Sequence, residues 1–152
     1  METVAGSDTA VYVGIFNDDY ERILHRDPDN IPFYQATGTG DAFLANRLSY
    51  FFNLKGPSLT LDTGCSGSLV ALHLACQSVQ TGESRQAIVG GVNLILDPEV
   101  MVSMSNLKLS SNPCRECGYL TRDTDSFRQR VVATHMMVAE RDTDVEKGWV
   151  VW

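Results

Sequence analysis

The chain has 152 residues, of which 43% are hydrophobic and 20% are charged, and its formal net charge is −7. This length supports one ordinary core but not two domains. The acidic balance argues against a nucleic-acid partner, since nucleic acids attract basic surfaces, and no apolar run is long enough to span a membrane. Residues 1–8 lack the basic and apolar regions of a signal peptide, so we expect a cytoplasmic protein.

Hydrophobic periodicity and turn residues predict seven regular elements, with a polar loop between the first helix and the second. In chain order we expect a strand at 9–16, a helix at 18–26, a loop at 29–40, a helix at 41–52, a strand at 57–62, a helix at 66–80, a strand at 86–95 and a helix from Pro98 toward Leu107. Strands that alternate with helices imply an α/β unit with a largely parallel sheet.

A cysteine stands where a strand turns into a helix in the segment LDTGCSGSLVALHLACQ, residues 61–77. The helix after it is apolar on nearly every face, so we expect it to be buried. Cys65 then lies at the helix N-terminus, where unpaired backbone N–H groups and the helix dipole favour a thiolate, the nucleophilic form. The small residues around it leave room for a substrate. From this geometry alone, Cys65 is either a nucleophile or a buried structural cysteine.

The other three cysteines favour structural interpretations. Without a secretory signal we expect free thiols rather than disulfides, and Cys76, in the middle of the helix, is expected to pack in the core. Cys114 and Cys117 have the spacing of half a zinc site or a redox pair. Zinc would need two further ligands, of which only His135 follows, and the preceding residues form a turn rather than a strand. We therefore expect no bound metal and no redox site.

The histidines and glycines point to packing and turns rather than to chemistry. His73 is eight residues after Cys65, about 12 Å along a helix axis, which is too far for direct proton transfer, so we expect it to be packed. His25 is expected to face solvent. The run 38–40 lacks the third glycine of a dinucleotide loop, and a serine elbow at Ser66 would need a glycine at position 68. The pair Gly90-Gly91 predicts close backbone packing.

The cysteine segment resembles the active-site motif of the β-ketoacyl synthases, the condensing enzymes of fatty-acid and polyketide assembly, whose usual text is DTACSSSLVALHLA. The flanking runs RLSYFFNLKGPSLTLDTG and GESRQAIVGGVNLIL are also similar to this family. The likeness is to ketosynthase domains of fungal-type reducing polyketide synthases and covers about residues 2–107. The resemblance implies a thiolase-like layered α/β fold, of which this chain holds most of the N-terminal half only.

What the resemblance implies chemically is a decarboxylative condensation. Cys65 would accept an acyl group from phosphopantetheine on an acyl carrier protein, and no cofactor would be bound by the chain itself. The resemblance also implies a homodimer or oligomer in which residues 58–61 form an edge strand. The family's two histidines lie more than a hundred residues beyond the cysteine, so we expect that the isolated chain cannot complete condensation. The alternative is a non-catalytic, truncated remnant that at most self-associates or pairs with a partner.

The sequence also departs from the family pattern. Gly64 replaces the usual alanine and Gly67 the usual serine, which adds backbone freedom near the helix start. We divide the chain into a partial ketosynthase N-terminal domain, 1–107, and an unrelated or disordered tail, 108–152. Our hypothesis is that the tail arises from a frameshift or a retained intron. The alternative is a genuine lineage-specific tail.

Overall fold

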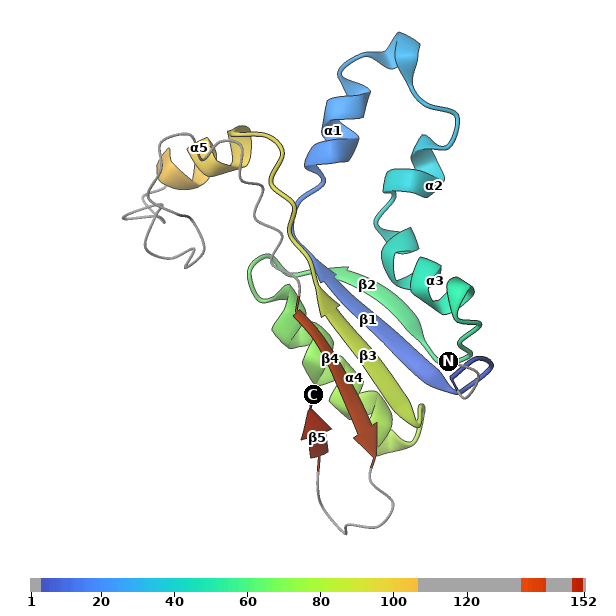
Figure 1. Cartoon of the computed structure of the whole chain (residues 1–152). Helices are drawn as coiled ribbons and strands as arrows, with labels where there is room; N and C mark the ends of the chain where they lie inside the picture. The colour runs from blue at the N-terminus through green and yellow to red at the C-terminus, as the bar shows by residue number, and fades with distance from the viewer. Residues whose placement is uncertain (1–3, 107–134, 142–148, 152) are drawn as a thin grey trace.

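A computed structural model describes residues 4–106, 135–141 and 149–151 (Figure 1). In chain order the elements are β1 (Thr9–Ile15), α1 (Asp19–His25), the 3₁₀ helix η1 (Pro28–Asn30), α2 (Gln35–Thr39), α3 (Ala42–Phe51), β2 (Ser58–Asp62), α4 (Gly67–Thr81), β3 (Gln86–Gly91), α5 (Glu99–Asn106), β4 (His135–Arg141) and β5 (Trp149–Val151). The predicted strand and helix alternation is present, and the region predicted as a loop, 29–40, contains most of η1 and the short helix α2.

The strands form one mixed sheet in the order β2-β1-β3-β4-β5. β1 pairs in parallel with β2 and with β3, whereas β4 runs antiparallel to both β3 and β5. All seven residues of β1 are buried, as expected for a strand with neighbours on both sides and a helix on each face. β2 lies at one edge of the described sheet, where the sequence predicted an edge strand.

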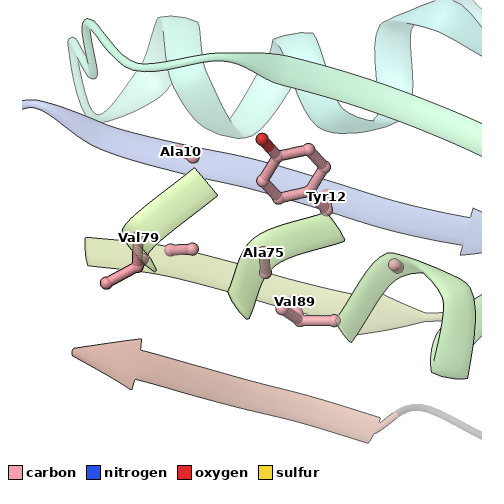
Figure 2. Close-up of a cluster of buried hydrophobic side chains, with 7 residues drawn as sticks. Ala10, Tyr12, Ala75, Val79 and Val89 are labelled. Atoms are coloured by element: carbon pink, nitrogen blue, oxygen red, sulfur yellow. The ribbon is translucent and has the colours of Figure 1, made fainter. Parts of the chain in front are cut away.

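Alternate residues of β1 and β3 belong to two different hydrophobic clusters because successive side chains of a strand point to opposite faces. On one face α4 covers a cluster of Ala10, Tyr12, Ala71, Ala75, Val79, Ala87 and Val89 (Figure 2). On the other face, toward α3, lie Val11, Val13, Ile15, Ala45 and Leu54. The small side chains of α4 let this helix lie close to the sheet.

The strand predicted at 86–95 is shorter than expected, since β3 ends at Gly91. The N–H of Val92 still donates to the carbonyl oxygen of Gly14 at 2.9 Å, and the chain then turns toward α1. There the buried carboxylate of Asp19 accepts the N–H groups of Leu96 and Asp97, each at 3.0 Å. These two hydrogen bonds end the strand by holding the following segment against α1 instead of against the sheet.

No helix in the described part of the chain is long and apolar enough to cross a membrane.

Candidate functional site

The turn at residues 63–66 joins the C-terminal end of β2 to the N-terminal end of α4, and it carries Cys65. α4 begins at Gly67, one residue later than predicted, so Cys65 lies two residues before the helix. The side chain of Cys65 is a free thiol in an exposed residue. The predicted arrangement of strand, turn and helix around this cysteine is therefore confirmed, and Cys65 is exposed rather than buried.

Local hydrogen bonds hold the turn in shape. The Ser66 hydroxyl donates to the carbonyl oxygen of Thr63 at 2.9 Å and lies 3.0 Å from the Thr63 hydroxyl oxygen. The N–H of Gly67 donates to the carbonyl oxygen of Gly64 at 3.0 Å. Although Ser66 occupies the N-cap position, its side chain makes no capping hydrogen bond to α4. The serine thus stabilises the turn around Cys65 instead of closing the end of the helix.

Glycines let the start of α4 approach the sheet closely. A Cβ added to Gly14 of β1 would lie 2.4 Å from the carbonyl carbon of Gly67, and one added to Gly91 of β3 would lie 2.5 Å from the Cβ of Ser68. Real Cβ atoms essentially never come this close. The prediction of close packing at Gly90-Gly91 is confirmed for Gly91, whereas a Cβ on Gly90 would make only ordinary contacts with Val13. These glycines place the first turn of α4, and with it Cys65, at the carboxyl ends of β1 and β3.

The exposure of residues on α4 corrects three expectations. The helix is not buried all round, because in the described residues the sheet covers only one of its faces. Leu69 is 69% exposed, and His73, four residues later on the same side, is exposed instead of packed. Cys76 is half-buried rather than fully in the core. His25, in contrast, is exposed as predicted.

A cleft of about 510 Å³ lies on the opposite face of the sheet from α4 and does not include Cys65. Its lining is mostly apolar, with Val13, Ile15 and Ile88 from the sheet and Phe43 and Leu48 from α3. At its rim, burial raises the pKa of the Asp41 carboxyl above its usual value, and the negative charges of Asp18 and Glu21 raise it further. Cys65 and the cleft are therefore separate features.

Sequence reasoning missed Asp62, the last residue of β2, whose carboxylate Oδ1 accepts the N–H of Gly64 at 2.8 Å. The signal was an aspartate two residues before a glycine, a frequent turn pattern. The predicted CxxC pair, Cys114 and Cys117, lies outside the described residues. Within the described part of the chain, no three His, Cys, Asp or Glu side chains gather as metal ligands would.

The sequence matches the family described as "Beta-ketoacyl synthase, N-terminal domain" over residues 1–127. Among curated proteins, it is 47% identical to a cyclo-acetoacetyl-L-tryptophan synthase of Aspergillus oryzae over 148 residues, which is 97% of this chain and 4% of that protein. It is 52% identical to the highly reducing polyketide synthase Preu1 of Preussia isomera over 111 residues, 73% of this chain and 5% of that protein. The chain thus spans about one twentieth of the length of these relatives.

The solved structures that this chain resembles are also ketosynthases. The ketosynthase from module 6 of the bacillaene synthase of Bacillus subtilis 168 superposes with a TM-score of 0.60 at 39% identity, covering 70% of this chain and 17% of that one. The oxazolomycin ketosynthase domain OzmH KS7 of Streptomyces albus JA3453 gives a TM-score of 0.56 at 36% identity, over 67% of this chain and 19% of that one. The prediction of an α/β, thiolase-like fold is confirmed. The division at residue 107 and the origin of residues 108–152 stay predictions.

Proposed function

Since this chain belongs to the β-ketoacyl synthase family, we propose that it is the cysteine-bearing part of a polyketide ketosynthase domain and that Cys65 is its acyl-accepting nucleophile. The observation that carries this proposal is the exposed thiol of Cys65 at the turn into α4, in a segment that resembles the family's active-site motif. A thiol that reacts with a large thioester must be accessible, and a structural cysteine need not be.

The first proposed step is transfer of an acyl group to the cysteine. The Cys65 thiolate attacks the thioester carbonyl of an acyl-phosphopantetheine, a bond forms between Sγ and the acyl carbon, and the phosphopantetheine sulfur leaves and takes up a proton. In the second step, a malonyl-type thioester loses carbon dioxide and its carbanion attacks the acyl-cysteine. The new carbon–carbon bond forms as the bond to Sγ breaks, which returns the cysteine thiolate.

The proposed substrates are acyl and malonyl-type thioesters on an acyl carrier protein. The phosphopantetheine arm belongs to that carrier and is a substrate group, so it requires no resident site in this chain. An arm that delivers a thioester needs an open approach, and Cys65 lies outside the cleft on the other side of the sheet. Relatives described as highly reducing polyketide synthases support the polyketide class.

We further propose that β2 is the strand through which the chain self-associates. β2 forms an edge of the described sheet, and Leu59 on it is 49% exposed. An exposed edge with an apolar side chain invites pairing with another strand. Light scattering should show dimers or larger species that Leu59→Lys shifts toward monomer. A protein that is monomeric at high concentration would contradict this proposal.

The competing function is a non-catalytic remnant that only associates with a partner, and acyl transfer separates the two. The purified chain would be incubated with an acyl-N-acetylcysteamine thioester, which mimics the end of phosphopantetheine, and its peptides mapped by mass spectrometry. We expect the acyl mass on the peptide of Cys65, its loss in Cys65→Ala and its persistence in the matched variant Cys76→Ala. Absence of acylation at Cys65, or equal acylation of Cys65 and Cys76, would refute the nucleophile assignment.

A further inference from the structure

The position of Cys65 depends on the peptide that precedes it, and this peptide has an unusual conformation. Gly64 has a φ of +64°, in the left-handed region that residues with a side chain rarely adopt. A Cβ placed on Gly64 would lie 3.6 Å from the ring of Phe16, which is ordinary van der Waals contact. Glycine adopts this conformation without steric cost, and an interaction with a neighbouring residue can stabilise it at this position.

The carboxylate of Asp62 provides that interaction. Its Oδ1 accepts the N–H of Gly64 at 2.8 Å, which closes a turn between the end of β2 and the residue next to Cys65. Asp62 is exposed, so burial does not oblige its carboxylate to find a protein partner. Its backbone is fixed by the sheet, because Asp62 pairs with Ile15 of β1. Because the sheet holds the backbone of Asp62, the hydrogen bond from the Gly64 N–H to its side chain fixes the turn relative to β2.

Two other hydrogen bonds hold the residues around Cys65. The Ser66 hydroxyl donates to the carbonyl oxygen of Thr63, which belongs to the same peptide group as the Gly64 N–H, and the N–H of Gly67 donates to the carbonyl oxygen of Gly64. The Asp62 hydrogen bond ties the Gly64 N–H to the end of β2. Losing it would leave this peptide held only at its carbonyl end, by the Ser66 hydroxyl, so the turn would loosen while the start of α4 stayed in place.

We propose that Asp62 is a positioning residue for Cys65, and that it acts as a hydrogen-bond acceptor and not through its charge. This inference rests on the proposed function of Cys65. An asparagine at position 62 can still accept the Gly64 N–H through its Oδ1 but carries no charge, whereas an alanine can do neither. Comparing Asp62→Asn with Asp62→Ala therefore separates acceptor from charge.

The chain also contains a matched control. Asp27 makes the same kind of turn, its Oδ1 accepting the N–H of Asp29 at 3.3 Å, at the start of η1. Asp27→Ala removes an exposed turn hydrogen bond of the same type from an element that carries neither Cys65 nor Cys76. Cys76, half-buried in α4, serves as an internal reference within each variant.

Two measurements on the full chain test the proposal: solvent exchange of the Gly64 amide by NMR, and the second-order rate of alkylation of Cys65 relative to Cys76 by iodoacetamide. We expect Gly64 exchange to rise about five- to tenfold in Asp62→Ala, the value of one lost hydrogen bond, and to stay within about twofold of the original in Asp62→Asn. At equal charge, Cys65 should be alkylated about two- to fivefold more slowly in Asp62→Ala than in Asp62→Asn, because a mobile turn no longer holds its sulfur at the end of the helix dipole.

Asp27→Ala should change neither quantity. Equal exchange and equal alkylation in the two Asp62 variants would overturn the proposal, because the acceptor would then have no effect. A parallel change of both cysteines, or the same change in Asp27→Ala, would also overturn it, because loosening of the whole fold would explain the result. Neither measurement uses an acyl donor. A chain that fails acyl transfer but shows the expected difference between the Asp62 variants would refute the nucleophile assignment alone.

Discussion

Gly14→Ala is the substitution that most directly tests how the sheet places α4. The added methyl group would meet three atoms of the helix start: the Gly67 carbonyl carbon at 2.4 Å, the Ser68 nitrogen at 2.6 Å and the Gly67 carbonyl oxygen at 2.7 Å. All three are backbone atoms, so no side-chain rotation can relieve the contact. Gly14 is also in the buried strand β1, paired with Leu61 on one side and with Gly91 on the other, and it cannot move away alone.

The helix must therefore separate from β1, which disturbs the cluster formed by Ala71 and Ala75 on the sheet. Overpacking that forces backbone shifts costs typically about 1–3 kcal/mol, and the three backbone contacts here put the expected loss at the upper end, about 3 kcal/mol. Urea denaturation followed by far-ultraviolet circular dichroism would measure it.

Gly38→Ala is the control because it makes the same chemical change without the contact. Gly38 lies in α2, and a Cβ there would meet no atom within 4 Å. Alanine favours a helix over glycine by up to about 1 kcal/mol, so this variant should be as stable as the original chain or slightly more stable. If Gly14→Ala lost no more stability than Gly38→Ala, the close seating of α4 would be wrong.

Three further predictions concern the thiols and the carboxylates. Cys65 should be alkylated about tenfold faster than Cys76 at pH 7, because Cys65 is exposed and Cys76 is half-buried; equal labelling in peptide mass mapping would contradict the structure. Asp19→Ala should lower stability in urea by about 2–4 kcal/mol, since the N–H groups of Leu96 and Asp97 lose their acceptor, and Asp19→Asn, which keeps one acceptor oxygen, should cost less. Asp41→Asn should stabilise the fold at pH 7, and the gain should shrink on acidification. Partial desolvation and the negative charges of Asp18 and Glu21 raise the pKa of Asp41 in the fold, so the original chain gains stability as that carboxyl protonates and loses it as the pH rises through the raised pKa. A gain that stayed constant between pH 7 and pH 3.5 would exclude this cause.

The parts of the fold that depend on local pattern could be predicted from the sequence. β-branched residues identified β1, and the motif around Cys65 identified both the turn and α4 to within a residue at each end. The close packing at Gly91 was predicted because two glycines in a strand have few other uses. Each of these depends on residues that are neighbours in the sequence.

The predictions that were wrong concern features that depend on residues distant in the sequence. β3 ends early because Asp19, more than seventy residues earlier in the chain, binds the segment that follows it, and no local pattern reports such a contact. His73 was expected to be packed because α4 is apolar on most faces, but whether a second face is covered depends on what lies beyond the sheet. Periodicity reports which residues tolerate burial and not which neighbours are present to bury them.

The inner face of α4 is packed against described residues, whereas its outer face is not covered by them. On the inner face, Gly67, Ala71 and Ala75 are buried against β1 and β3, and the turn with its hydrogen bonds fixes where Cys65 emerges. On the outer face, Leu69 and His73 are exposed, and the described residues do not enclose the thiol. Transfer of an acyl group to a thiol requires an accessible and positioned sulfur that can lose its proton. Condensation also requires a group that stabilises the developing charge and a site that excludes water. For that reason acyl transfer to Cys65, the first half-reaction, is the step that tests the function we propose for this chain.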